Sequence, residues 1–340
     1  MSAMNSSARA LNVVLGPGSK AHRHAAHPPQ QPTDHPRSDE LAPGFRPQPS
    51  WNLVNNGGPT IAQLTFVNCY VNASGAYSSD DMRQIDAALS CAMSDPGLQS
   101  VIEQYFEGET VTSTMLQSVV HEMSLPATVY KDFAEALAKQ LHDAGVLGDA
   151  DPSQSVINIM LPPGIVLSDD FSPSHTPAAA ERTEHERRRG GVIKIDPDDA
   201  ASSKEGLGGY HGGIRLGAGA SCYYAVGVYS DADNGIVAFD EPWKNVVATF
   251  YHELNEARTD AAVEDVNATG NGHLLGWYSQ TGQGEIGDLP INAAGDIALV
   301  FKEVELADGS GTVPIQLMWS NAACGPAAAA QVAAAMPSAS

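Results

Sequence analysis

The sequence predicts a domain of the α/β (α+β) class with one mixed sheet and flanking helices. Two observations predict it. The chain contains apolar runs of strand length, and it also contains stretches in which apolar residues recur every three or four positions, as in helices. The two kinds of segment follow one another along the chain. The runs of strand length are residues 60–71, 155–162 and 222–229. The helical stretches start near residue 80 and cover about 98–105, 127–144 and 240–263.

The first half of the chain is expected to hold a strand followed by helices. Residues 60–71 alternate between apolar and polar side chains, as in a partly buried strand. Residues 78–81 read Ser-Ser-Asp-Asp, a cluster of N-cap residues, and the next residues place a Met, an Ile and a Leu on one helical face. The helix expected at 127–144 repeats an apolar residue at every fourth position and ends at Gly145.

The second half is expected to hold two buried strands, one long helix and a hairpin. Residues 155–162 form a compact apolar run that a proline closes, and residues 222–229 form a second strand. A long helix begins at about Asp240. An Asp-Gly-Ser-Gly turn joins residues 297–305 to residues 313–319, which predicts the hairpin.

The domain boundaries follow changes in composition. Residues 1–50 are rich in Pro, Ser and His without apolar periodicity, and we expect a disordered arm. Residues 51–324 then form a single domain. Within it, residues 168–208 lack periodicity and are expected to be a long surface loop, with a short strand at 192–195. Residues 325–340 are an Ala-rich tail.

The net charge restricts the partners that the protein can bind. The formal net charge is −22, from 40 acidic and 18 basic residues. Such a surface repels phosphate backbones and anionic lipids, so we expect no nucleic-acid partner. No apolar run is long enough for a membrane span. The apolar stretch at residues 11–15 is too short for the core of a secretory signal, so we expect no recognisable signal peptide.

The cysteines exclude one kind of metal site. Cys69, Cys91, Cys222 and Cys324 form no CxxC pair, so a zinc site made of cysteines is not expected. Two alternatives remain at this stage: one or two disulfides, or four buried free thiols.

One segment carries specific chemistry, the expected helix around residues 251–260, which reads Tyr-His-Glu-Leu-Asn-Glu-Ala-Arg-Thr-Asp. On a helix, His252 and Glu256 lie one turn apart, so both side chains can reach one ion. An imidazole with a carboxylate suits Zn²⁺. Glu253 projects about 100° further round the helix. In HExxH enzymes this glutamate is the general base; here Glu256 replaces the second histidine, which makes the motif HExxE.

A zinc site needs at least one more protein ligand. Asp260 falls on the same stripe of the helix if the helix continues. Glu285 and Asp288 can reach back from the loop that follows the helix. His211 lies among glycines that let the backbone approach closely. Of these candidates, Asp260 and the Glu285/Asp288 loop are favoured over His211.

The apolar side of the same helix gives an independent check. Its apolar residues fall within an arc of roughly 100°, and His252 and Glu256 project from nearly the opposite side. These apolar residues are Trp243, Val246, Val247, Phe250, Leu254, Ala257 and Ala261. The core therefore does not require the motif residues. The alternative interpretation is an ordinary amphipathic helix that shows its polar face to water.

Three segments carry a family resemblance. The segment from His252 to Asp260, then Gly276-Trp-Tyr278 and Gly284-Glu-Ile-Gly-Asp288, resembles the HELxEAxTD, GWY and GEIGD elements of bacterial proteins that are similar to the plant exordium/phosphate-induced family. The likeness spans roughly residues 51–290. The resemblance implies an extracellular or cell-surface protein with a zincin-like core. This chain departs from the pattern at Ala261, where the family commonly has a proline.

These observations together predict a metal-dependent hydrolase, a zincin-like metallopeptidase that acts on peptides or proteins. Glu253 is the expected general base. The expected metal ligands are His252, Glu256, Asp260, Glu285 and Asp288, with His211 as an additional candidate. The expected ion is Zn²⁺, with Ca²⁺ as the alternative. The alternative function is a non-catalytic secreted or surface interaction protein with a structural metal site.

Overall fold

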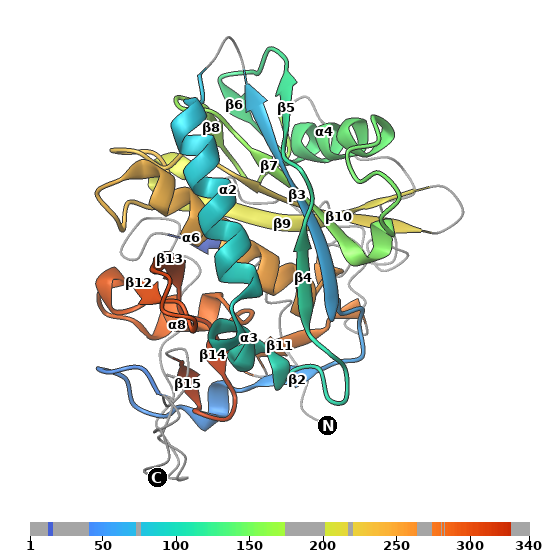
Figure 1. The fold of residues 1–340 in the computed structure, drawn as a ribbon. Helices are drawn as coiled ribbons and strands as arrows, with labels where there is room; N and C mark the ends of the chain where they lie inside the picture. The colour runs from blue at the N-terminus through green and yellow to red at the C-terminus, as the bar shows by residue number, and fades with distance from the viewer. Residues whose placement is uncertain are drawn as a thin grey trace, which may run out of the picture.

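The computed structural model describes residues 13–15, 41–72, 76–173, 201–216, 220–263, 274–279, 281 and 283–327. Its centre is a seven-stranded sheet in the order β1-β9-β10-β7-β3-β4, in which β5 also pairs with β3 (Figure 1). The strands of this sheet are β1 (Val13–Leu15), β3 (Gln63–Asn72), β4 (Thr112–Met115), β5 (Val119–Glu122), β7 (Ser155–Met160), β9 (Leu207–Arg215) and β10 (Ser221–Gly227).

Helices and paired short strands surround the sheet. The α-helices are α2 (Ser79–Ser94), α3 (Pro96–Glu103), α4 (Lys131–Asp143), α6 (Pro242–Thr259) and α8 (Asp288–Ala293). The short 3-10 helices are η1 (Pro49–Trp51), η2 (Pro152–Gln154), η4 (Ser203–Glu205) and η7 (Ile297–Leu299). The paired short strands are β2 (Leu53–Asn55) with β11 (Trp277–Ser279), β6 (Thr128–Val129) with β8 (Val166–Leu167), β12 (Phe301–Glu305) with β13 (Thr312–Gln316), and β14 (Trp319–Ser320) with β15 (Gly325–Pro326).

The main sheet is mixed, which confirms the predicted α/β (α+β) class. β3 runs parallel to β4, β5 and β7, and β7 runs parallel to β10. The edge strands β9 and β1 are antiparallel to their neighbours. The three strand-length runs of the sequence thus lie side by side as β3, β7 and β10, where both faces of the sheet are covered and a continuous apolar run is the expected pattern.

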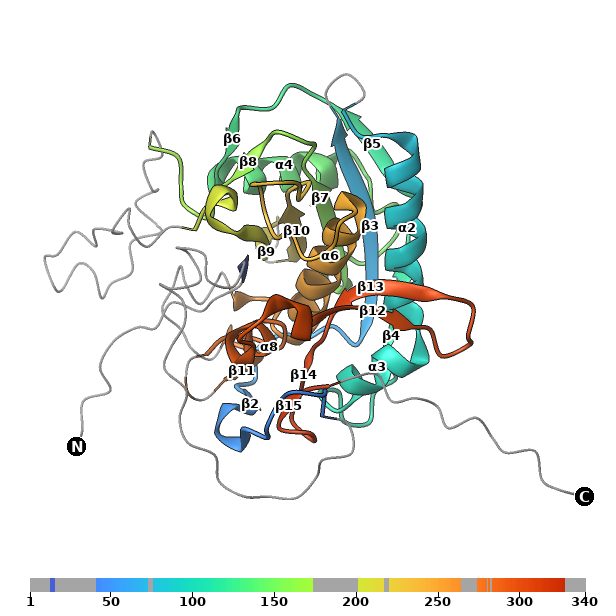
Figure 2. The ribbon, with the colours of Figure 1, turned by 90° about the vertical axis from the view of Figure 1, so that its left-hand side faces the viewer.

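The two faces of the sheet carry separate cores. In β7, Val156 and Met160 pack with α2, α3 and α6, whereas Ile157 and Ile159 pack with α4 on the other face (Figure 2). Ser78 caps α2 by accepting a hydrogen bond from the N–H of Asp81, as the N-cap cluster predicts. The alternation of the side chains along each strand therefore places α6 and α4 in different layers.

Two glycines allow α6 to approach the sheet closely. A Cβ atom at Gly227 would lie 3.0 Å from the ring of Phe250. At Gly209 it would lie 3.0 Å from the methyl group of Thr249 and 2.7 Å from the carbonyl oxygen of Val226. Any larger residue would push the helix away from β9 and β10. This close approach sets the helix against the segment of β9 that carries His211.

The helix α6 is buried on both sides. Its apolar stripe packs in the core with α2 and the sheet, while β13 covers another side. His252, Glu253 and Glu256 are all fully buried. The alternative of a surface helix with a water-facing polar side is therefore wrong. The periodicity of one helix cannot reveal this burial, because the covering strand comes from a distant part of the chain.

The folded part extends beyond the predicted boundaries at both ends. Ala42 is buried, Leu41 pairs with Ala327, and the N–H of Gln48 donates to the carbonyl of Cys324 at 2.6 Å. The assignment of residues 41–50 to the disordered arm is therefore wrong, and so is the assignment of residues 325–327 to the tail. Each of the two segments is held by the other, a long-range contact that local composition does not show.

Part of the predicted 168–208 loop belongs to the fold. The carboxylate of Asp169 accepts the N–H of Ala201 at 2.7 Å, Ser168 pairs with Ser202, and β9 already begins at Leu207. The remainder of this loop, including the strand expected at 192–195, lies outside the described residues.

All four cysteines are free, and only Cys69 and Cys222 are buried. Neither the disulfides nor four buried thiols are thus observed. Within the described residues, no helix has the length and apolar character needed to cross a bilayer.

Arg258 anchors the end of α6. Its side chain is buried and donates to the carbonyl oxygens of Ala62 at 3.2 Å and Thr112 at 2.7 Å. Burial lowers the pKa of this guanidinium to about 10. The helix end is thereby fixed to the starts of β3 and β4.

Replacing Arg258 by methionine is expected to destabilise the fold by about 2–4 kcal/mol, because the carbonyls of Ala62 and Thr112 both lose a charged donor. Urea unfolding measures the change. Arg83→Met is the matched control: Arg83 is exposed and pairs with Asp80 on the same helix, so the loss there should stay below about 0.5 kcal/mol. Equal effects of the two substitutions would contradict the anchoring role.

Candidate metal centre

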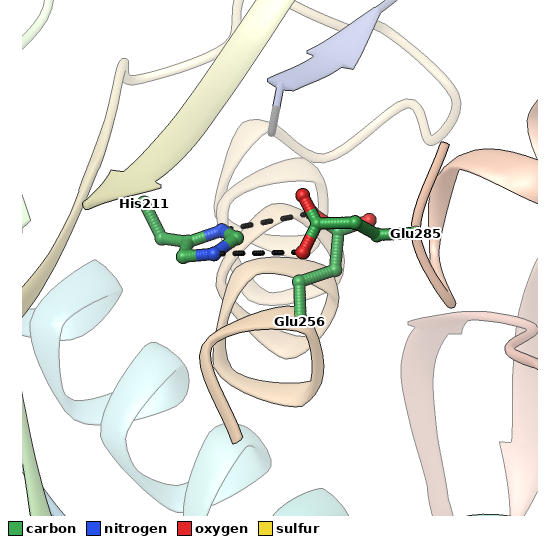
Figure 3. Close-up of side chains that lie close together, drawn as sticks. All are labelled: His211, Glu256 and Glu285. Carbon is green, nitrogen blue, oxygen red and sulfur yellow. Dashed lines mark ion pairs between the residues drawn. The ribbon is translucent and has the colours of Figure 1, made fainter. Parts of the chain in front are cut away.

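Seven titratable side chains meet around the C-terminal half of α6. They come from β9, from α6 and its C-cap residue, and from the loop before α8 together with the first residue of α8. Figure 3 shows three of them, one from each of these three parts of the chain. All seven are buried, six with no exposed surface and one with 5% exposed. They are His211, His252, Glu253, Glu256, Asp260, Glu285 and Asp288. These are the residues that the sequence nominates.

The helix aligns the first two donors as their spacing predicts. The Nε2 atom of His252 lies 3.1 Å from the Oε1 atom of Glu256, one turn away. Glu253 completes this group, in which one donor atom from each of the three side chains lies within 4.8 Å of the others. The HExxE motif thus presents an imidazole and two carboxylates to one small volume.

Gln316 on β13 fixes the orientation of His252. The Nδ1 atom of His252 lies 2.7 Å from the Oε1 atom of Gln316. The amide nitrogen of Gln316 donates to the carbonyls of Gly287 at 2.6 Å and Leu317 at 3.3 Å, so Oε1 is the atom left to accept. Nδ1 therefore carries a hydrogen, and Nε2 faces Glu256. Sequence analysis missed Gln316, since no local pattern marks a residue in a distant strand.

Gly287 allows the loop of the GEIGD segment to contact α6 directly. A Cβ atom there would lie 2.5 Å from the Nδ1 atom of His252, so only glycine fits against this ring. The N–H groups of Gly287 and Asp288 both donate to the Oε1 atom of Glu256 at 3.1 Å. The GEIGD segment thereby binds directly to the HExxE helix.

The rest of the GEIGD segment directs Glu285 toward the centre. The carboxylate of Asp288 accepts the N–H of Glu285 at 3.2 Å and closes a turn. Gly284 begins this turn with a φ of +117°, which favours glycine. Both carboxylate oxygens of Glu285 are buried, and neither has a hydrogen-bond partner within the described part of the chain. Asp288 therefore shapes the loop that carries Glu285.

His211 reaches the centre from the sheet. Its Nδ1 atom lies 3.4 Å from a carboxylate oxygen of Glu253 and 3.7 Å from the Oε2 atom of Glu256. Its Nε2 atom lies 3.3 Å from the backbone carbonyl of Asp260 and 3.7 Å from a carboxylate oxygen of Glu285. Because a carbonyl only accepts, Nε2 is assigned the hydrogen, and Nδ1 faces the carboxylates of the helix.

The structure groups His211, Glu256 and Glu285 as a second set of donors within 4.8 Å (Figure 3). Asp260 and Asp288, which the sequence favours over His211, belong to neither set. Asp260 accepts the N–H of Gly276 at 2.8 Å at the end of the helix. These two aspartates therefore hold backbone around the centre, while His211 contributes directly.

The buried carboxylates of the centre carry more negative charge, when ionised, than the neighbouring side chains can neutralise. Burial raises the pKa of Asp260 to about 8, and burial with the charge of Glu256 raises those of Glu285 and Asp288 well above their usual range. Burial lowers the pKa of His252, but the charge and hydrogen bond of Glu256 outweigh it, so the pKa is raised overall. Without an added cation, the centre holds protons.

The donor set fits a divalent cation. Imidazole nitrogens and carboxylate oxygens are the ligands of Zn²⁺, and buried oxygens without partners are expensive unless a cation or a proton neutralises them. One oxygen each of Glu256 and Asp260, and both oxygens of Glu285, lack hydrogen-bond partners in the described residues.

The metal-free chain should lose stability as pH rises from about 4 to about 8. The pKa of Asp260 rises from 3.8 to about 8 on folding, so the native state binds more protons than the unfolded state throughout this window. Urea unfolding in chelator at pH 5 and pH 8 measures the decline. Asp260→Asn should reduce the decline, whereas Asp143→Asn at an exposed site should not. An unchanged decline in Asp260→Asn would refute this account.

Comparisons with protein-family models, with curated proteins and with solved structures find no match to this chain.

Proposed function

We propose that this chain is a metal-dependent hydrolase, a zincin-like metallopeptidase that binds Zn²⁺ at the HExxE helix. The observation that carries the proposal is the burial of two imidazoles and five carboxylates in one volume, with carboxylate oxygens that lack hydrogen-bond partners in the described part of the chain. Such a set is stable only with a cation or with bound protons. The family resemblance of the HELNEARTD, GWY and GEIGD segments supports the same conclusion.

The ligands of the helix suit zinc better than calcium. His252 offers its Nε2 atom beside Glu256, and its other nitrogen is held by Gln316. A zinc-bound histidine typically donates its second N–H to a carbonyl or carboxylate in this way. Calcium prefers six to eight oxygen donors and would leave the imidazoles unused. The further ligand comes from the surrounding side chains, among which Glu285 has both oxygens available.

Glu253 is the general base in this proposal. A bound divalent ion polarises a carbonyl group and lowers the pKa of a water molecule. Glu253 adjoins His252 on the helix and belongs to the same donor group. Its carboxylate would take a proton from the attacking water and pass it to the leaving amine. Peptides are the proposed substrates through the resemblance to zincins.

A structural metal site in a surface interaction protein is the second candidate. The complete burial of the donors favours it, because a substrate has to reach a catalytic ion. A cavity of about 270 Å³ at the start of α6 is lined by Asp240, Lys244 and Glu303 and contains none of the seven residues. In this alternative, the ion ties α6 to the GEIGD loop.

Replacing Glu253 by glutamine distinguishes the two candidates. In the hydrolase, Glu253→Gln should lower peptide hydrolysis by about 10²–10⁴-fold while zinc content and thermal stability stay near wild type. Elemental analysis and an assay with unfolded protein substrates measure both. His252→Ala should lose zinc as well as activity. A wild type that binds zinc without any turnover would favour the structural site, and a wild type that binds no metal would refute both.

Gln316→Leu should weaken zinc binding by about 10–100-fold, because His252 loses the acceptor that orients its ring. Competition with a fluorescent zinc chelator measures the affinity. Gln140→Leu is the control, since the amide nitrogen of Gln140 contacts a histidine on the surface, the Nε2 atom of His121, at 3.1 Å. An affinity that changes equally in both variants would rule out the orienting role of Gln316.

A further inference from the structure

We propose that the centre holds two divalent cations and that Glu256 bridges them. One ion lies at the group of His252, Glu253 and Glu256, and the other lies at the group of His211, Glu256 and Glu285. This inference rests on the proposed function and extends it from one ion to two.

The geometry of Glu256 is the first observation. The two donor groups share only this residue. Its Oε1 atom lies 3.1 Å from the Nε2 atom of His252, while its Oε2 atom lies 3.7 Å from the Nδ1 atom of His211. Each carboxylate oxygen therefore faces a different imidazole. This is the arrangement of a carboxylate that bridges two metal ions, which lie about 3.5–4 Å apart in known two-metal sites.

The two imidazoles are the second observation. Each has one nitrogen placed against an outer acceptor: the side-chain oxygen of Gln316 for His252, and the backbone carbonyl of Asp260 for His211. Each therefore turns its other nitrogen toward the carboxylates of α6: Nε2 of His252 faces Glu256, and Nδ1 of His211 faces Glu253 at 3.4 Å and Glu256 at 3.7 Å. A neutral imidazole nitrogen that faces a carboxylate is repelled unless a proton or a cation lies between them. Each ring thus has its own orienting hydrogen bond, and each of two separate ions would need a histidine that is oriented in this way.

The charge balance is the third observation. Five buried carboxylates surround α6, and Glu285 interacts electrostatically with the other four. With all five carboxylates ionised and both imidazoles neutral, one divalent ion would leave three negative charges in the interior, whereas two ions leave one. The nearby guanidinium of Arg258 is directed at backbone carbonyls and does not neutralise this group.

The carboxylate oxygens of Glu285 indicate where the second ion would bind. Both are fully buried and have no hydrogen-bond partner in the described residues, and Figure 3 shows the carboxylate turned toward His211. The donor group of the HExxE helix, which is His252, Glu253 and Glu256, does not include this side chain. A second ion between His211, Glu256 and Glu285 uses donors from the sheet, the helix and the loop.

Metal stoichiometry tests the inference. The full chain is stripped with chelator, loaded with Zn²⁺, freed of excess metal by gel filtration and analysed for zinc per chain. The histidines of the N-terminal arm, His22, His24, His27 and His35, are replaced by alanine in every sample so that they contribute no zinc. Wild type should hold about two ions per chain.

Variants then locate the ions. His211→Gln and Glu285→Gln should each reduce the content from about two ions to one, and so should His252→Gln. Glu256→Gln should lose more than one ion because it serves both sites. Loading with Co²⁺ adds a second readout: bridged ions couple magnetically, so the spin signal should be weaker than that of two isolated ions. Circular dichroism confirms that each variant is folded.

The outcomes separate this inference from the proposed function. One ion that His252→Gln removes and His211→Gln leaves in place would overturn the second site while the hydrolase proposal stands. Two ions that persist in both His211→Gln and Glu285→Gln would also overturn the inference. No bound zinc in the wild type would overturn both. Two ions that fall to one in each single-site variant support the bridged pair.

Discussion

The cost of removing carboxylates from water determines the structure around α6. A charged group in the interior has to meet hydrogen-bond donors, a counter-charge or a proton. Here the donors are backbone N–H groups: Gly287 and Asp288 serve Glu256, and Gly276 serves Asp260. These contacts bring two loops against one helix. What remains is an excess of acceptor oxygens at the middle of the centre, where a cation would satisfy them together.

The glycines of the motifs mark places where backbone passes the helix too closely for any side chain. Gly209 lies over Thr249, Gly287 lies against the ring of His252, and a Cβ atom at Gly276 would collide with the backbone of Thr259. Gly276 and Gly287 lie in neighbouring segments, whereas Gly209 lies in a distant one. A Gly-rich motif beside a candidate ligand therefore indicates close packing as much as flexibility. This explains why the GWY and GEIGD segments accompany the HExxE helix.

The local part of this architecture could be predicted from the sequence. The apolar run at β7, the Ser78 cap of α2 and the spacing of His252 and Glu256 depend on neighbours within a few residues, and periodicity reveals them. The burial of α6 and the role of Gln316 could not be predicted, because both depend on where a distant hairpin packs. Local sequence ranks His211 too low for a similar reason: its distance to Glu256 depends on how closely α6 packs on β9.

The contact between His252 and Gln316 has a consequence for the biogenesis of the protein. The two residues are 64 positions apart, and the strand that carries Gln316 is among the last elements of the fold. During synthesis the helix emerges from the ribosome well before its orienting partner does. The imidazole can therefore meet this partner only after residue 316 has been synthesised. The oriented centre therefore depends on a segment that is made after the helix, and a chain truncated before residue 316 would lack the acceptor for His252.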